Sequence, residues 1–176
     1  MTGRARFVVP AIGIVFFLIV AAVAMGDWWN GAGNPISRPA IDAIEAHIGT
    51  ARQTESIVRR DHGEVRRQVY WQNGLPIKIV ERFDLGGNTG EIASYFADGT
   101  PLRVDRAQSF MITQGGGAGE RVRSHMVIDY ENDRFLAGWK SVNGGPSEPD
   151  EHEIRASYRY AQDTYEEVVS PVERPR

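Results

Sequence analysis

The sequence contains no cysteine, only two lysines and none of the common motifs of catalysis or metal binding. Without cysteine, the chain has no disulfides, no lipid-modified cysteine and no thiol chemistry. The zinc-protease, serine-hydrolase, nucleotide-binding and calcium-loop signatures are also missing. The histidines show no ligand spacing; they are His47, His62, His125 and His152. We therefore expect no metal, no cofactor and none of the enzymes that these motifs identify.

Charge argues against nucleic acid as a partner. The 176 residues carry a net charge of -3, and two arginines of that total precede the first apolar segment. The part of the chain beyond that segment is therefore more acidic still. A net negative domain repels phosphate backbones and anionic lipid headgroups. We expect neither nucleic acid nor an anionic lipid surface to be a partner of the domain.

The first long feature is an uncharged run from Phe7 to Met25. A run of this length just spans the apolar part of a bilayer. Arg4 and Arg6 precede it and favour a cytoplasmic N-terminus, while Trp28 follows at the position of an interfacial aromatic. The pattern predicts a cytoplasmic stub over residues 1–6 and a membrane anchor over residues 7–26.

A cleaved signal peptide is the alternative interpretation of the same segment. Ala22-Val23-Ala24 supplies the small-x-small pattern of a cleavage site, but the run is longer than most signal cores. Both interpretations export the rest of the chain. We expect a single-pass protein of the bacterial inner membrane with its domain in the periplasm, or a periplasmic protein after cleavage.

Three stretches of the sequence repeat one pattern, in which an aromatic strand end is followed by a two-residue turn and an apolar strand start. They are Tyr70–Ile77, Tyr95–Leu102 and, more loosely, Asp129–Leu136. Asn-Gly and Asp-Gly tolerate the positive φ angles of a type I′ turn, which makes this pattern a strong hairpin signal. The repeats predict an antiparallel meander of about six to seven strands.

Helical patterns flank the predicted meander. Before it, Ile41, Ile44 and Ile48 fall on one helical face. After it, Asp150 and Glu153 have the spacing of a capping box. An apolar stripe then continues through Ile154, Tyr158, Ala161, Tyr165 and Val168. The fold class expected is α+β, with an N-terminal membrane helix, a short helix, the meander and a C-terminal amphipathic helix.

The boundaries follow from these elements. Residues 27–35 are rich in Gly, Asn and Pro and form a predicted linker. The extracytoplasmic domain is expected over residues 36–169. Residues 170–176, with two prolines and mixed charge, are expected to be a disordered tail.

The two-residue turns also predict which side chains share a face. They place Arg66 opposite Glu81, and Trp139 beside Met126 in the final hairpin. His125, Asp129 and Lys140 would then share the other face of that hairpin. The basic cluster is interpreted as cross-strand pairing with acids such as Glu81, with a lipid-headgroup site as the alternative; its members are Arg59, Arg60, Arg66 and Arg67.

Aromatic side chains are the candidates for a ligand or partner site. A partly covered sheet face is where an apolar pocket forms, and a terminal amphipathic helix is a common docking element. The candidates from the sheet and the helix are Trp71, Phe96, Trp139, Tyr158 and Tyr165. Packing in the core is the competing interpretation of all five.

The order helix, hairpin repeats and helix resembles small exported bacterial meander proteins, a group that implies no catalytic residues. The Tyr-x-x-Asn/Asp-Gly spacing is also similar to the repeats of MORN-type sheets, but the spaced Gly-x-Gly of those repeats is missing. Their scaffold role is therefore not carried over to this chain.

Two functions from different classes remain. The first is a membrane-tethered extracytoplasmic binding or interaction domain, with another envelope protein as its partner. The second is an envelope hydrolase or lyase that uses His125 with a basic partner. An arrangement of His125, Asp129 and an arginine around a concave pocket would favour the enzyme.

Overall fold

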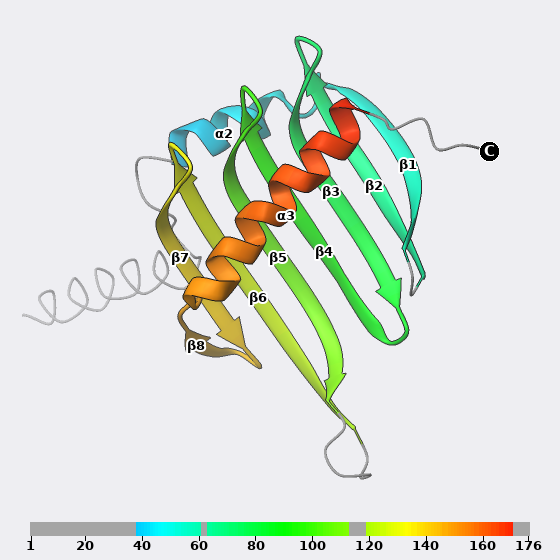
Figure 1. Cartoon of the computed structure of the whole chain (residues 1–176), viewed down its shortest axis with the longest axis vertical. Helices are drawn as coiled ribbons and strands as arrows, with labels where there is room; N and C mark the ends of the chain where they lie inside the picture. The colour runs from blue at the N-terminus through cyan, green and yellow to red at the C-terminus, as the bar shows by residue number, and fades with distance from the viewer. Residues whose placement is uncertain (1–37, 61–62, 113–118, 171–176) are drawn as a thin grey trace, which may run out of the picture. The chain divides into compact units, whose positions relative to one another are not determined.

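The computed structural model describes residues 38–60, 63–112 and 119–170, which form one antiparallel sheet and two helices (Figure 1). The eight strands lie side by side in the order in which they occur in the chain. The elements are α2 (Arg38–His47), β1 (Arg52–Arg60), β2 (Gly63–Gln72), β3 (Leu75–Leu85), β4 (Asn88–Ala97), β5 (Thr100–Ile112), β6 (Glu120–Glu131), β7 (Arg134–Val142), β8 (Gly145–Ser147) and α3 (Glu151–Val169).

The predicted fold class was wrong in two respects. The sheet has eight strands instead of the six to seven expected, because the Gly-Pro-Ser segment at residues 145–147 pairs with β7 as a short edge strand. Glycine and proline disfavour strands but are tolerated at a sheet edge. The low strand propensity of these residues therefore gave no indication of β8. The described part of the chain is mostly β and includes no N-terminal membrane helix. Residues 1–37 lie outside it, and no helix of the described ranges is long and apolar enough to cross a membrane.

The hairpin turns predicted from Asn-Gly and Asp-Gly are confirmed. Asn73 and Gly74 have φ angles of 51° and 83°, and Asp98 and Gly99 have 49° and 87°, as a type I′ turn requires. The meander is therefore encoded locally, turn by turn.

Each of the three repeated hairpins contains one β-bulge at the same place. The bulged residue is the third residue after the two-residue turn. The unpaired residues are Ile77, Leu102 and Leu136. A bulge shifts the register by one residue, and a shift of one exchanges the faces of all later partners. As a result Glu81 faces Arg67 rather than Arg66. In the last hairpin Lys140, and not Trp139, lies opposite Met126, so that expectation was wrong as well.

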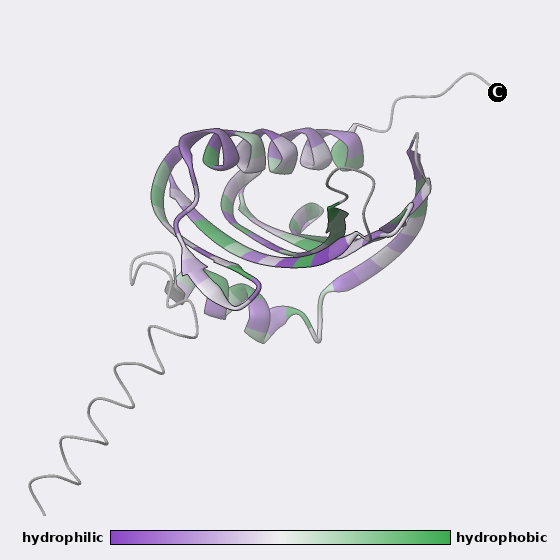
Figure 2. Ribbon diagram, turned by 90° about the horizontal axis from the view of Figure 1, so that it is seen from below, coloured by the Kyte–Doolittle hydropathy of each residue, from purple (hydrophilic) through white to green (hydrophobic). Residues whose placement is uncertain are grey.

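The curved sheet has a helix on each face (Figure 2). The long helix α3 crosses the concave face diagonally, and its predicted apolar stripe packs there against Phe96, Ile128 and Tyr130. The short helix α2 packs on the opposite face against Val80 and Tyr95. The two faces of the sheet are thus both partly covered, because each carries apolar residues.

Helix α3 begins at the predicted capping box. The Asp150 carboxylate accepts a hydrogen bond from the Glu153 backbone N–H at 2.8 Å, and the Glu153 carboxylate accepts one from the Asp150 N–H at 3.0 Å. Two of the otherwise unpaired N–H groups of the first turn are satisfied in this way. The Tyr130 hydroxyl then attaches the helix to β6 by donating to the Ile154 carbonyl at 2.8 Å.

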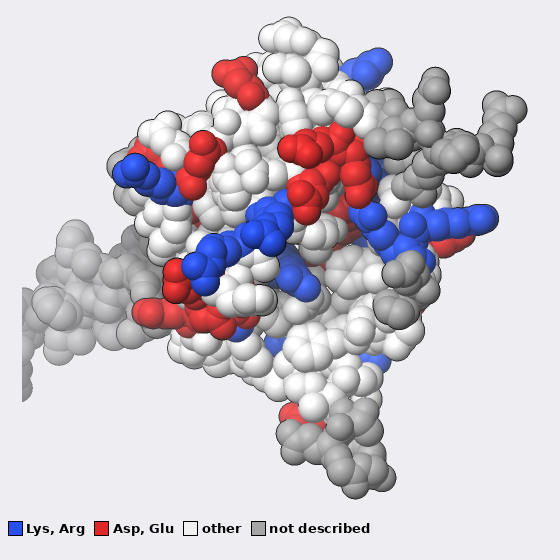
Figure 3. Space-filling model, in the orientation of Figure 1, with Lys and Arg blue, Asp and Glu red and all other residues white. Residues whose placement is uncertain are grey.

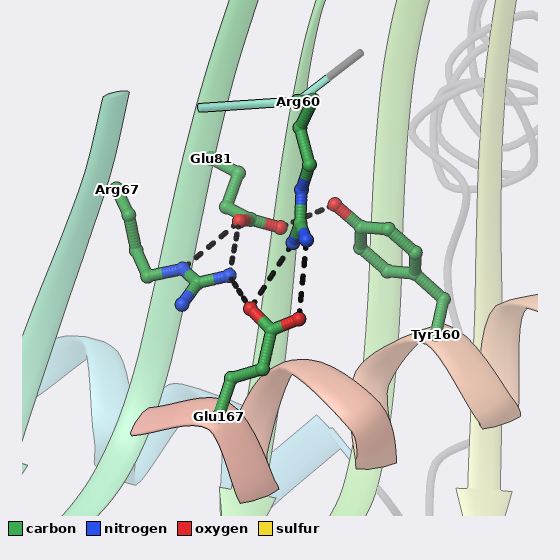
Figure 4. A network of polar contacts seen from close by, with 5 residues as sticks. All are labelled: Arg60, Arg67, Glu81, Tyr160 and Glu167. Atoms are coloured by element: carbon green, nitrogen blue, oxygen red, sulfur yellow. Dashed lines mark hydrogen bonds and ion pairs between the residues drawn. The ribbon is translucent and has the colours of Figure 1, made fainter. Parts of the chain in front are cut away.

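A network of five polar side chains attaches the C-terminal half of α3 to the first three strands (Figure 4). Arg67 of β2 donates through Nε to Glu81 of β3 at 2.9 Å and through Nη2 to Glu167 of α3 at 2.7 Å. Arg60 of β1 binds both carboxylate oxygens of Glu167 at 3.1 Å. Tyr160 of α3 donates its hydroxyl to the second oxygen of Glu81. The network, which we call the α3 clamp, therefore joins four elements.

The α3 clamp contains two cations and two carboxylates, so its formal charges cancel. Arg67 and Glu81 are only 5% and 1% exposed, whereas Arg60 and Glu167 reach the solvent. Partial burial raises the pKa of Glu167, but the hydrogen bonds and charges of Arg60 and Arg67 outweigh it and hold that pKa below its usual range. Within the described ranges no buried side-chain nitrogen or oxygen lacks a hydrogen-bond partner, as a stable buried ion pair requires.

Removing one charge from the buried part of the α3 clamp should be costly. We expect Arg67→Met to lower the free energy of unfolding by about 3–5 kcal/mol, because Glu81 would be left buried without its counter-ion. Arg82→Met is the matched control, because it breaks an exposed pair with Glu91 and should cost about 0–1 kcal/mol. Urea unfolding of both variants measures the difference; equal losses would show that the buried pair of the α3 clamp contributes no more to stability than an exposed pair.

Candidate functional site

Helix α3 leaves one side of the concave face uncovered, and a cleft of about 860 Å³ lies there. Figure 3 shows a mostly uncharged surface on that side of α3. The floor comes from the end of β3, the start of β4 and the end of β5, and the start of β2 adds to it. Its apolar side chains are Val65, Phe83, Leu85, Ile92 and Phe110. The cleft is therefore a part of the sheet's apolar face that the helix does not fill.

The strand register explains how this floor is built. Val65, Phe83, Gly90 and Gln108 are successive cross-strand neighbours and form one row across β2 to β5. Gly90 has no side chain, and a Cβ atom there would lie 2.7 Å from Phe83 Cζ. The phenyl ring thus lies over the glycine and closes the floor, because an aromatic ring covers the exposed backbone that a glycine leaves in a strand.

One wall of the cleft is formed by members of the α3 clamp. Tyr160 and Arg60 both line it. Burial, and then the neighbouring Glu81 carboxylate, raise the pKa of the Tyr160 phenol. This phenol stays protonated and donates to Glu81, while Arg60 is held by both oxygens of Glu167. Both polar groups of this wall are therefore committed to holding α3.

Arg106 is the third cation of the concave face near the cleft, and its surroundings differ. Its cross-strand neighbours are Ile92 and Met126, both buried and apolar. The guanidinium Nε donates to the Gln108 side-chain oxygen at 2.9 Å. Among the residues that the structure describes, Arg106 forms no ion pair. The cleft thus combines an apolar floor with the guanidinium of Arg106, whose terminal nitrogens make no side-chain hydrogen bond within the described residues.

This arrangement offers the groups that a binding site for an apolar molecule needs. The cleft offers apolar surface, two guanidinium groups, side-chain amides and hydroxyl groups. Over residues 38–60, 63–112 and 119–170, no group of three His, Asp or Glu side chains comes together in a way that could hold a metal ion. What the cleft can do chemically is to enclose an apolar molecule and donate hydrogen bonds to it.

The five aromatic candidates lie elsewhere. Phe96 is buried under α3, with its ring centroid 5.0 Å from that of Tyr165. Tyr158 packs at 5.0 Å on Tyr130 and donates to Asp133. Trp71 donates through its indole to Thr54 at 2.8 Å, and Trp139 touches His125 edge-on at 5.1 Å. None of these side chains lines the cleft described above.

The residues of the enzyme hypothesis are not assembled. His125 hydrogen-bonds Asp105 at 2.8 Å on the face opposite to α3. Asp129 is buried on that face and holds Arg103 through both its oxygens, at 2.6 and 2.9 Å. Lys140 is on the concave face and pairs with Glu153 of α3 at 2.5 Å. The bulge at Leu136 is the physical reason that Lys140 is separated from the other two.

The sequence did contain a signal for the cleft that we did not use. Val104, Arg106, Gln108 and Phe110 alternate along β5 and therefore share one face. That alternation continues past the point where α3 crosses the strand. Only the path of the helix shows which of these side chains it covers and which it leaves accessible.

The contact between His125 and Asp105 predicts a pH-dependent contribution to stability. The hydrogen bond to Asp105 raises the pKa of His125 above its usual value near 6.5, although partial burial opposes the shift. A raised pKa means that the protonated ring stabilises the fold below about pH 6.5 and that this contribution disappears as the pH rises through the folded-state pKa. Asp105→Asn should lower the pKa of His125 in an NMR titration, whereas Asp163→Asn on α3 should not change it. An unchanged value in Asp105→Asn would contradict the assigned cause.

The fold and the cleft were compared with known proteins. No protein-family model matches the chain, and neither a curated protein nor a solved structure matches it.

Proposed function

We propose that this protein is an extracytoplasmic binding domain whose concave cleft takes up a small molecule with a large apolar part. The observation that supports the proposal is the uncovered part of the concave sheet face, whose apolar floor lies open beside α3. Ligand sites are concave, mostly apolar and equipped with a few polar groups that fix orientation. The volume of about 860 Å³ falls within the range of such sites.

The way in which α3 is held supports a cleft that persists without ligand. Collapse of the helix onto the floor would fill the cleft, but the α3 clamp and the pair of Lys140 with Glu153 fix the helix near both of its ends. A preformed cavity lowers the ordering cost of binding. The cleft is thus available to a ligand in the free protein.

The environment of the domain is proposed from the sequence alone. The uncharged segment from Phe7 to Met25 favours attachment to, or export across, the bacterial inner membrane, with the domain in the periplasm. An apolar binding cleft suits that place, because poorly soluble molecules near a membrane need a protein to shield them from water. The expected envelope-protein partner stays a prediction.

Binding can be measured with the uncharged fluorescent probe N-phenyl-naphthylamine. We expect a saturable rise in fluorescence with the purified domain, and a dissociation constant about five- to tenfold weaker in Phe110→Ser, because that ring forms part of the apolar floor. Phe135→Ser is the matched control, since Phe135 is an exposed phenylalanine that does not line the cleft. Thermal unfolding of both variants checks that they fold.

Two results would contradict this proposal. One is the absence of saturable probe binding to the native domain. The other is an equal loss of affinity in Phe110→Ser and Phe135→Ser, which would place the probe outside the cleft.

The proposed location is tested separately. A protease added to intact spheroplasts should degrade the domain if it lies outside the cytoplasm, and gel mobility shows whether the leader is retained. Protection of the domain until the membrane is lysed would contradict export. Degradation of a shortened protein would favour cleavage over anchoring.

A further inference from the structure

We infer that the ligand of the cleft is a single-chain amphiphile with one carboxylate, and that Arg106 binds this acid group. The inference rests on the proposed binding function and names the chemical class of its ligand. It follows from the balance of charge among the side chains that line the cleft, from the surroundings of Arg106 and from the shape of the floor.

The charges of the side chains that line the cleft do not balance. Among the described residues, two arginines and no carboxylate line it. Arg60 pairs with Glu167 in the α3 clamp. Arg106 forms no ion pair among the residues that the structure describes, and it donates to the uncharged Gln108. The described lining of the cleft thus lacks one negative charge, which a monoanionic ligand would supply.

The surroundings of Arg106 strengthen its interaction with such an anion. The side chain is half-buried between Ile92 and Met126, two buried apolar residues. Charges interact more strongly at a partly buried site than in water, and a guanidinium is more weakly hydrated than an ammonium group, so a carboxylate that reaches Arg106 gains more than it would at an exposed site. With Nε engaged by Gln108, the terminal nitrogens remain as donors, and their planar fork fits the two oxygens of a carboxylate.

The floor indicates how the rest of the ligand lies. Arg106 is at one end of the uncovered floor, in the same cross-strand row as Glu81 of the α3 clamp. From there Gln108 and Phe110 follow along β5, and Phe83 and Leu85 follow along β3. Arg106 and Phe110 are about 13 Å apart along the strand, comparable to the length of a dodecyl chain. An acid group at Arg106 would place such a chain along the apolar floor toward the β3–β4 turn.

The test compares dodecanoate with dodecanol as competitors of N-phenyl-naphthylamine, both below the concentrations at which they aggregate. The two molecules share the alkyl chain and differ in the acid group. For the native domain we expect dodecanoate to bind about tenfold more tightly than dodecanol, because a charge-assisted hydrogen bond to a guanidinium is added to the same apolar contact.

Variants of the arginine assign this preference to one side chain. In Arg106→Gln the ratio of the two affinities should fall below about threefold, and in Arg106→Lys it should be intermediate, because the charge remains and the fork is lost. Arg121→Gln is the matched control: this arginine is exposed, donates to Ser109 and does not line the cleft. It should keep the full preference.

The outcomes separate the two proposals. If the probe does not bind at all, the proposed function fails. If the probe and dodecanol bind but dodecanoate has no advantage, or if its advantage survives in Arg106→Gln, the inference about the carboxylate fails and the binding function stands. If dodecyl phosphate binds the native domain more than tenfold tighter than dodecanoate, a dianionic headgroup replaces the carboxylate and the inference is overturned.

Discussion

The buried ion pair of Arg67 with Glu81 is the interaction on which the arrangement of the domain depends. It is formed between two neighbouring strands, but each partner also reaches a residue of α3, Glu167 in one case and Tyr160 in the other. A buried charge is tolerated only when its partners are in place. The pair therefore restricts where the helix can lie, and the position of the helix determines which part of the concave face is packed and which part remains a cleft.

The curvature of the sheet has a cause that repeats along the chain. Bulges at Ile77, Leu102 and Leu136 occur at the same position in three hairpins. A bulge bends its strand and increases the local twist, so three aligned bulges help to curve the sheet around α3. Pro76 precedes the first bulge and Phe135 the third, which shows that proline is not required for it. The same repeat thus supports the meander, the concave face and, through the shift of register, the pairing of Arg67 with Glu81.

Two arginines on one sheet face differ in how far the fold satisfies them, because their neighbours differ. Arg67 lies opposite a carboxylate and acts as a structural counter-ion. Arg106 lies in the same cross-strand row, but isoleucine and methionine flank it. The first is satisfied within the fold, and the second keeps donors that a ligand can use. Residue type alone does not separate these roles; the identity of the cross-strand partners does.

What the sequence determined by itself was local. Turn residues such as Asn73-Gly74, the capping box at Asp150 and the apolar stripe of α3 depend on neighbours within a few positions, and all three were predicted. The number of strands was missed because β8 has no strand propensity of its own and exists only as the partner of β7. The faces of the hairpins were missed because a single bulged residue reverses them. The cleft was decided only by the tertiary structure, since it is the part of the sheet that a helix from the far end of the chain does not cover.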